Sequence, residues 1–268
     1  MNDKSRFDKI CNDIESIKIQ GARNVAKAGL NAYYLKPSVS SKKKLLSLRS
    51  TEPMLKNVLD LTNKVPRNEI MKHFDNAQDK INKHTLKLIK SNDIIYTHCH
   101  STNVSNSLIY AKKKGKNFEV YNTETRPLFQ GRRTAKELKN NGIKVTMFID
   151  SAMDIALSEK QKTKKVNKIF IGADALTRNG IINKVGSGAI AKLAMINKIP
   201  LYIIADSWKY TSNKVPMENR KLNEIWDKAP KDIKLKNPSF EFVPKKYITK
   251  IITEHGALDY NDFLKKVG

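Results

Sequence analysis

The chain has 268 residues, 40% of them hydrophobic, and a formal net charge of +25, so it can bury a sizeable core without disulfides or structural metals. It has no apolar run near the ~20 residues that span a bilayer, its charged first residues lack the apolar core of a signal peptide, and its two distant cysteines cannot frame a disulfide-rich fold. The sequence thus excludes membrane-spanning and disulfide-framed classes, and we expect a cytoplasmic protein that binds no membrane.

The excess of positive charge suggests an anionic partner, such as a phosphorylated metabolite, a nucleic acid or an acidic protein. It comes mostly from scattered lysines, without the arginine and aromatic residues that interleave on an RNA-binding face. A chain rich in Lys, Asn and Ile can equally reflect a biased genome. We therefore interpret most of these lysines as solvated and do not expect a nucleic-acid partner.

The first part of the chain, residues 1–90, follows the period of an α-helix. The apolar residues that set this period at the N-terminus are Phe7, Ile10, Cys11, Ile14 and Ile17. Pro66 stands before a second helical run, where a proline is tolerated in the first turn. We expect a helical N-terminal domain over residues 1–90, with Cys11 in its core.

The pattern changes after residue 90, where short apolar runs alternate with helix-like segments. The runs that read as strands are 93–98, 118–123, 144–150, 168–174 and 200–206, and a late one is 247–256, followed by a closing helix at 259–267. Strands separated by helices of about 10–15 residues imply βαβ units. We predict a Rossmann-like α/β catalytic domain over residues 91–268, built on a mainly parallel, doubly wound sheet.

Reactive or hydrogen-bonding side chains follow five of these runs. They are His98-Cys99-His100-Ser101, Glu124-Thr125-Arg126, Asp150-Ser151, Asp174 and Asp206-Ser207. Because the carboxyl ends of parallel strands meet at one edge of the sheet, where loops and helix starts converge, we expect a small-molecule site there.

Cys99 lies at a strand-to-helix turn between two histidines, and three interpretations are open. Helix-terminal N–H groups and a neighbouring imidazolium would lower the thiol pKa from ~8.5 and make it reactive. An inert, buried cysteine fits equally well. A zinc site is the weakest, because His73, His84 and His255 are isolated and no second Cys/His pair has ligand spacing. We expect no metal, and these three histidines to be exposed or satisfied.

Two further loops have the composition of ligand-binding segments. Residues 185–188 (VGSG) open a helix whose N–H groups could bind an anion. Neither a G-x-G-x-x-G motif after the first strand nor a P-loop lysine motif is present, so the usual dinucleotide and ATP motifs are absent. Residues 123–133 carry Arg126 and Gln130, which suit oxyanion and hydroxyl recognition or belong to an ordinary solvated connector.

Taken together, four stretches resemble one known family. They are THCHS (97–101), TETRPLFQG (123–131), IGADALTRNGIINKVGS (171–187) and IPLYIIADSWKY (199–210). The family contains methylthioribose-1-phosphate isomerase, archaeal ribose-1,5-bisphosphate isomerase and the regulatory (alpha, beta and delta) subunits of translation initiation factor 2B. Its fold, a helical N-terminal domain followed by a Rossmann-like domain, is the one that the periodicity also predicts.

The resemblance implies a catalytic pair at Cys99 and Asp174, the cysteine of the THC motif and the aspartate of the GAD motif. The initiation-factor subunits generally lack this pair, and THCHS is more similar to the bisphosphate branch than to the methylthioribose branch. We therefore expect an aldose–ketose isomerase that converts ribose 1,5-bisphosphate into ribulose 1,5-bisphosphate. Cys99 would accept the proton and Asp174, its pKa raised by burial, would donate one.

Further properties follow from the resemblance alone: no cofactor, a homo-oligomer that is a dimer or an assembly of dimers, and a nucleotide as a candidate activator, which the residues themselves do not indicate. Two alternatives stay open. One is a methylthioribose-1-phosphate isomerase, and the other is a non-catalytic regulatory subunit that acts as a protein-binding module.

The resemblance also implies a set of substrate-binding residues. They are Gln20, Gly21, Ala22, Arg23, Arg49, Gln130, Asn183, Lys184 and Lys209. The sequence departs from the family at Gln20, where an arginine is usual, and at Glu52, where Arg-Pro-Thr-Ala becomes Arg-Ser-Thr-Glu. The amide of Gln20 does not replace a permanent bidentate cation, which weakens the expectation of phosphate binding near residue 20. Arg23 is the nearby cation that could compensate.

Overall fold

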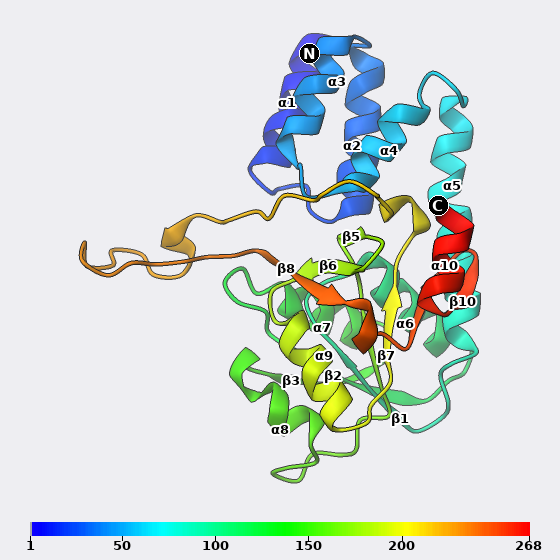
Figure 1. Ribbon diagram of the computed structural model, residues 1–268, viewed down its shortest axis with the longest axis vertical. Coiled ribbons are helices and arrows are strands. Elements are labelled where there is room, and N and C mark those ends of the chain that lie inside the picture. Colours follow the sequence, from blue (N-terminus) through cyan, green and yellow to red (C-terminus); the bar gives the residue numbers. More distant parts are fainter. Residues whose placement is uncertain (1) are drawn as a thin grey trace.

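The computed structural model describes residues 2–268 and shows a group of helices stacked on an α/β part (Figure 1). The N-terminal helices are α1 (Asp3–Glu15), α2 (Ala22–Leu35), α3 (Val39–Leu48), α4 (Pro53–Leu61) and α5 (Arg67–Leu86). The side chains of Asn2 and Ser38 cap α1 and α3 by accepting backbone N–H groups of the first turn. Cys11 lies in the buried face of α1, as the helical period predicts.

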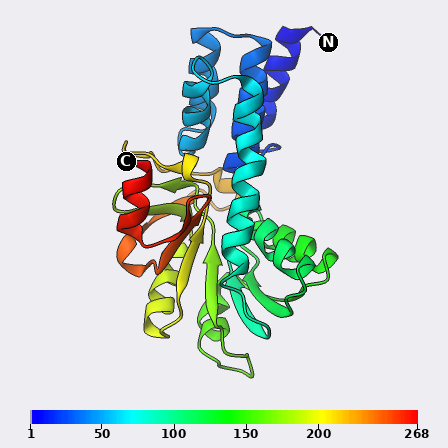
Figure 2. The ribbon, with the colours of Figure 1, turned by 90° about the vertical axis from the view of Figure 1, so that its right-hand side faces the viewer.

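Helix α5 belongs to both parts of the molecule. Near its start, Ile70 and Phe74 pack against α2 and α4, whereas Ile81 near its end packs in the hydrophobic cluster beneath the large sheet. Figure 2 shows α5 running from the helical part down alongside the strands. Helix α5 ends at Leu86 and the first strand begins at Asp93. Because α5 packs in both parts, the division into two domains at residue 90 stays a prediction.

The α/β part is built on a seven-stranded sheet with the order β10-β9-β7-β4-β1-β2-β3. Its strands are β1 (Asp93–Thr97), β2 (Phe118–Thr123), β3 (Lys144–Phe148), β4 (Lys168–Ile171), β7 (Leu201–Ile204), β9 (Lys250–Thr253) and β10 (Gly256–Leu258). Only β10 runs antiparallel to its neighbour, so the prediction of a mainly parallel sheet is confirmed.

Helices cover both faces of this sheet, as the doubly wound pattern predicts. They are α6 (Thr102–Lys113), α7 (Gln130–Asn140), α8 (Met153–Leu157), α9 (Ser187–Ile196) and α10 (Tyr260–Val267). One hydrophobic cluster joins α8, α9 and α10 to the sheet, and another joins α5, α6 and α7 to it. Strands β1 and β4 are buried along their whole length, which explains the apolar runs at 94–96 and 169–171 that follow their charged first residues.

The strand order reverses between β1 and β4. From β1 the chain adds β2 and β3 on one side, and from β4 it adds β7 and β9 on the other. Such a switch point leaves a crevice beyond the carboxyl ends of the two strands, where open α/β sheets bind their ligands. Cys99 follows β1 and Asp174 follows β4, so both lie at this crevice.

A second sheet was not expected from the sequence. It has three antiparallel strands, β5 (Ala175–Leu176), β6 (Gly180–Lys184) and β8 (Phe240–Pro244), and lies over the carboxyl edge of the large sheet (Figure 1). Residues 211–238 then leave the body as a long arm, which Figure 1 shows in yellow to orange. Single turns of 3-10 helix are η1 (Asp150–Ala152), η2 (Ser207–Lys209), η3 (Leu222–Glu224) and η4 (Lys245–Tyr247). Within residues 2–268, every helix is too short or too polar to cross a bilayer.

Candidate active site

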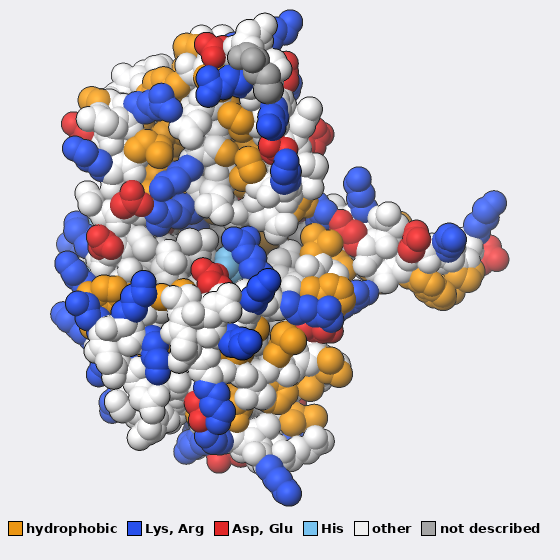
Figure 3. Space-filling view, turned by 180° about the vertical axis from the view of Figure 1, so that it is seen from behind, with side chains coloured by type: hydrophobic (Ala, Val, Ile, Leu, Met, Phe, Trp, Pro, Cys, Tyr) orange, Lys and Arg blue, Asp and Glu red, His pale blue; other side chains and the backbone are white. Residues whose placement is uncertain are grey.

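The crevice at the switch point is a cavity roofed by the helical part. It encloses about 950 Å³, counting the part open to solvent. Lysine and arginine side chains gather around a hollow between the two parts in Figure 3. All eleven residues predicted for the site line this cavity: Gln20, Gly21, Ala22, Arg23, Arg49, Cys99, Gln130, Asp174, Asn183, Lys184 and Lys209.

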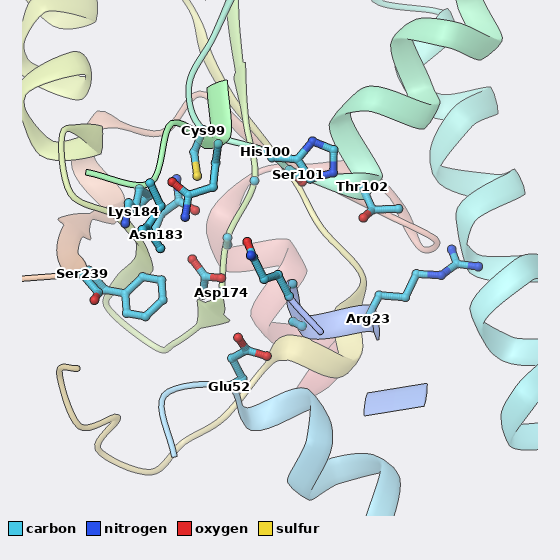
Figure 4. A pocket seen from close by; sticks show the side chains of 18 of the residues that line it. Arg23, Glu52, Cys99, His100, Ser101, Thr102, Asp174, Asn183, Lys184 and Ser239 are labelled. Carbon is cyan, nitrogen blue, oxygen red and sulfur yellow. The ribbon is translucent and has the colours of Figure 1, made fainter. Parts of the chain in front are cut away.

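Cys99 is held in a strained backbone conformation directly after β1. Its φ is +63°, in the left-handed region that non-glycine residues rarely adopt. Its N–H donates to Thr125 Oγ1 at 3.0 Å, and its carbonyl accepts from Thr134 Oγ1 at 2.8 Å. These two contacts, one from the loop after β2 and one from α7, fix the turn and point the sulfur into the cavity (Figure 4).

The two histidines beside Cys99 are neutral. His98 Nε2 donates to the carbonyl of Val185 at 2.9 Å, so Nδ1 accepts from the hydroxyl of Thr123 at 2.6 Å, and burial lowers the pKa of His98. Burial, aided by Arg133, lowers the pKa of His100 to about 4. Of the three interpretations left open for Cys99, a thiol activated by a neighbouring imidazolium is therefore not favoured, because desolvation disfavours the charged form of both rings.

The pKa of the Cys99 thiol is also raised, not lowered. Burial raises it to about 12, the charge of Lys184 opposes the rise, and the carboxylate of Asp174 adds to it. The backbone N–H of His100 lowers the pKa, as a helix start should, but its effect is smaller than that of desolvation. At neutral pH Cys99 thus carries its proton.

This protonation state predicts slow alkylation. The residue is partly exposed and its sulfur lines the cavity, so a small reagent can reach it, but the thiolate is scarce at pH 8. We expect iodoacetamide to modify Cys99 about 10- to 100-fold more slowly than free cysteine at about pH 8, and to speed up with rising pH. Mass spectrometry of the peptide that contains Cys99 measures the rate. A rate equal to that of free cysteine would show that the thiol is activated.

Asp174 faces Cys99 from the loop after β4. Burial raises the pKa of Asp174, with Lys209, Arg49 and Lys184 opposing the rise, which is the direction expected from the sequence. The loop can lie this close to the Cys99 turn because residue 172 is glycine. A Cβ there would lie 2.5 Å from the Oγ of Ser101. Figure 4 shows the sulfur of Cys99 and the carboxyl group of Asp174 pointing into the same space.

Two lysines and an asparagine surround this pair. Lys209 is buried, its Nζ donates to the carbonyl of Ala173 at 2.7 Å, and burial lowers its pKa. Asn183 and Lys184 end strand β6 of the small sheet, and both are buried in the cavity wall. The Nδ2 of Asn183 donates to Ser187 Oγ at 2.8 Å, which ties β6 to the start of α9. The small sheet therefore positions residues that the sequence placed only in a loop.

The N-terminal side of the cavity differs from the expectation in one respect. Arg23 lines the cavity, but its Nη2 lies 2.6 Å from Asp75 Oδ1 on α5, and Figure 4 shows its side chain extending away from Asp174. Arg23 therefore does not stand in directly for the arginine that Gln20 replaces.

Sequence reasoning missed several polar residues of the lining. They are Glu52, Arg133, Glu218, Arg220 and Ser239. Glu218 and Arg220 come from the base of the arm, which shows no helical or strand period, and Ser239 precedes β8. Glu52 stands at the start of α4, where an acidic residue is usually solvated. Ser239 lies in the stretch NPSFEFVP (237–244), a further segment that resembles the family and that could have pointed to it.

A second cluster of polar side chains lies outside the cavity. Side-chain ligand atoms of His73, Asp206 and Glu254 all lie within 4.8 Å of one another. The sequence suggested that His73 is isolated, and this was wrong. Asp206 accepts from His73 Nε2 and from the N–H of Trp208, and the ring of His73 stacks on that of Trp208 at 3.5 Å. The expectation of a satisfied histidine is met by these contacts, which join α5 to the turn that carries Lys209.

Fold and site together define a protein class: a Rossmann-like sheet under a helical cap, with a cation-lined cavity at the switch point that suits a small phosphorylated ligand. The sequence model of the Initiation factor 2 subunit family matches residues 23–260, so the chain belongs to this family.

Named relatives and a solved structure agree with this assignment. The chain is 32% identical to the ribose 1,5-bisphosphate isomerase of Methanocaldococcus jannaschii, over 95% of this chain and 91% of that protein. It is 32% identical to the methylthioribose-1-phosphate isomerase of Exiguobacterium sibiricum, over 81% and 72%. The structure of translation initiation factor eIF-2B from Pyrococcus horikoshii OT3 has the same fold, with a TM-score of 0.82 and 24% identity over 95% and 97% of the chains.

Proposed function

We propose that the chain is an aldose–ketose isomerase that converts ribose 1,5-bisphosphate into ribulose 1,5-bisphosphate by acid–base catalysis. The observation that carries the proposal is a thiol and a carboxyl group, Cys99 and Asp174, that extend from adjacent strands into one cavity lined by lysines and arginines. Relatives that bear the name ribose 1,5-bisphosphate isomerase support the choice of substrate.

The reaction needs proton transfers and one bond cleavage. Cys99, as a thiolate, takes the proton from C2 while the bond between C1 and the ring oxygen breaks. Asp174 protonates the ring oxygen as it leaves, and the product of this step is an enol with a double bond between C1 and C2. Asp174 then removes the proton of the C2 hydroxyl as the carbonyl forms, and Cys99 returns a proton to C1. Both groups end as they began, so acid–base chemistry suffices without a cofactor.

The carboxylate of Asp174 can accept the proton that Cys99 must lose. At neutral pH the thiol is protonated, since its pKa is about 12, and burial also raises the pKa of Asp174. Moving the thiol proton to the Asp174 carboxylate creates the thiolate and the acid together and takes no proton from solvent. Lys184, which opposes the rise in the thiol pKa, stabilises this arrangement. Asn183, Lys209, Gln130 and Arg49 would hold the hydroxyl and phosphate groups.

The assay that tests this proposal is direct. The purified protein is incubated with ribose 1,5-bisphosphate, with methylthioribose 1-phosphate and without substrate, and the ketose products are measured. We expect conversion of the bisphosphate. Conversion of methylthioribose 1-phosphate alone would assign the chain to that activity, and inactivity on both would favour a non-catalytic regulatory subunit.

Self-association is the second part of the proposal, with a second copy of the chain as the partner. The arm carries large apolar side chains that are about half exposed: Met217, Leu222, Trp226 and Ile233. The edge strand β3 and the residue after it add Met147 and Ile149, which are 46% and 58% exposed. The Nη2 of Arg126 donates to the carbonyl of Ile225, so the arm is anchored near this edge. Exposed apolar side chains of this number typically mark an interface.

Replacing Trp226 by glutamate is therefore expected to weaken the oligomer. A charge buried at the centre of an apolar interface typically costs a few kcal/mol, enough to shift a micromolar dimer to monomer. Size-exclusion chromatography with light scattering measures the mass. Lys231→Glu, an exposed charge reversal on the same arm, is the matched control and should keep the mass of the unmodified protein. A monomeric unmodified protein would contradict the proposed interface.

A further inference from the structure

Glu52 is a buried carboxylate in the roof of the cavity. Its side chain is 1% exposed, and as the residue before α4 it accepts no N–H group of that helix. Instead Oε1 accepts from Arg49 Nη2 at 2.7 Å, and Oε2 has no hydrogen-bond partner. Figure 4 shows the carboxyl group pointing toward Asp174 and the interior of the cavity. Glu52 is thus turned toward the ligand space and not toward its own helix.

The guanidinium group of Arg49 also lacks hydrogen-bond partners. Its side chain is 8% exposed, and both Nε and Nη1 are buried without a hydrogen-bond partner. Glu218 Oε2 lies 3.6 Å from Nε, too far for a hydrogen bond. Buried polar atoms in native proteins are nearly always paired, because a buried donor or acceptor without a partner loses its hydration and gains nothing in return. Three orphans on one ion pair inside a cavity indicate a place that a ligand with several acceptor oxygens completes.

The pKa of Glu52 lies close to neutral pH. Burial raises its pKa to about 7, with the charges of Asp174 and Glu218 adding to the rise and those of Arg49 and Lys209 opposing it. These four residues are the charged groups that face Glu52, from the loop after β4, the arm, the end of α3 and η2. The carboxyl group is therefore present in both forms near neutral pH.

We propose that Glu52 is the internal counter-anion of Arg49, that a substrate phosphate displaces it from the guanidinium, and that the ionised Glu52 carboxylate takes up a proton from solvent when the phosphate binds. This inference rests on the proposed function, because it assigns a proton-linked phosphate contact to the same site. A phosphate offers Arg49 the acceptors that Nε and Nη1 lack. Once protonated, Glu52 can donate its O–H to the same phosphate instead of repelling it.

The direction of the pH dependence follows from this linkage. The negative phosphate disfavours ionised Glu52, so its pKa is higher in the complex than in the free protein. Anion binding is therefore strongest when Glu52 is already protonated, below about pH 7, and weakens by up to tenfold per pH unit above it. The second ionisation of a phosphate monoester, near pH 6, works in the opposite direction because it increases the negative charge of the ligand.

Inorganic sulfate is the probe that tests the proposal, because it does not titrate near neutral pH. Its affinity is measured by calorimetry between about pH 6.5 and about pH 8.5, in two buffers of different ionisation enthalpy to count protons. The unmodified protein should lose at least tenfold in affinity over this range and take up protons on binding. Glu52→Gln should lose most of this dependence and bind sulfate about tenfold more tightly than the unmodified protein at the upper pH.

Glu218→Gln is the matched control, since it removes the other carboxylate that faces Arg49 and should keep the pH dependence. A flat profile in the unmodified protein would overturn the proposal without any variant. A Glu52→Gln protein with the full pH dependence would overturn it as well. The gain in affinity cannot come from misfolding, and sulfate binding needs no turnover, so this result is independent of whether the protein isomerises a sugar phosphate.

Discussion

Replacing Cys99 by serine or Asp174 by asparagine is expected to lower kcat by about 10²–10⁴-fold in each case, the usual contribution of a positioned acid or base. A serine hydroxyl is a far weaker acid than a thiol and does not give its proton to Asp174, and an amide N–H is far too weak an acid to protonate the ring oxygen. Neither change removes a cation from the cavity lining, so KM should change far less than kcat. Steady-state kinetics with ribose 1,5-bisphosphate measure both parameters.

The double variant tests whether the two groups act as a unit. If Cys99 and Asp174 exchange one proton, removing both should cost little more than removing the more important one. Cys11→Ala is the matched control for loss of a thiol, because Cys11 lies in the core of the helical part. Turnover of Cys99→Ser or Asp174→Asn at the rate of the unmodified protein would remove the proposed mechanism.

The positions of Cys99 and Asp174, the proposed catalytic pair, could be predicted because they depend on topology. Polar side chains at the ends of apolar runs must meet at one edge if the strands are parallel, and Cys99 and Asp174 do meet there. Asn183 and Lys184, in contrast, were predicted as substrate-binding residues from the family resemblance alone. Their strand, β6, pairs with β8, nearly sixty residues further along the chain, and so short an antiparallel sheet has no periodicity of its own to detect.

The ionisation states could not be predicted from the same residues. A cysteine between two histidines at a helix start suggests an activated thiol, and only the depth of burial shows that desolvation outweighs the helix start and keeps both rings neutral. Glu52 shows the same limit. Its sequence position indicates a solvated carboxylate at a helix start, whereas the fold places it under Arg49 with the cavity in front of it.

Arg23 illustrates a third limit, which is competition between partners. The sequence offers it as an arginine close to Gln20, but Asp75 on α5 lies opposite and pairs with it at 2.6 Å. Residues 52 positions apart in the chain give no signal of this pairing. The predicted fold, by contrast, was insensitive to such pairings because it rests on long apolar periods and on the rule that βαβ units cross over to the right.

The two strands that precede the proposed catalytic pair are joined at their opposite ends by a buried ion pair. Asp93 is the first residue of β1 and Lys168 the first of β4, and their side chains are 6% and 9% exposed. The ammonium group of Lys168 donates to Asp93 and to the carbonyl of Leu88, and Asp93 also accepts the N–H of Lys90 at 2.6 Å. The pair thus fixes how β1 and β4 start relative to each other, far from the cavity.

Lys168→Met is therefore expected to lower the free energy of unfolding by about 3–5 kcal/mol, because it leaves the Asp93 carboxylate buried without its cation. Urea denaturation followed by circular dichroism measures the change. Asp93→Asn combined with Lys168→Met should restore at least half of the loss, since no uncompensated charge is then buried. Lys265→Met, which breaks an exposed pair with Asp262, should leave the urea midpoint unchanged. If Lys168→Met were as stable as this control, the ion pair would not be what holds the start of β4 against β1, and their register would rest on the ladder and the apolar side chains alone.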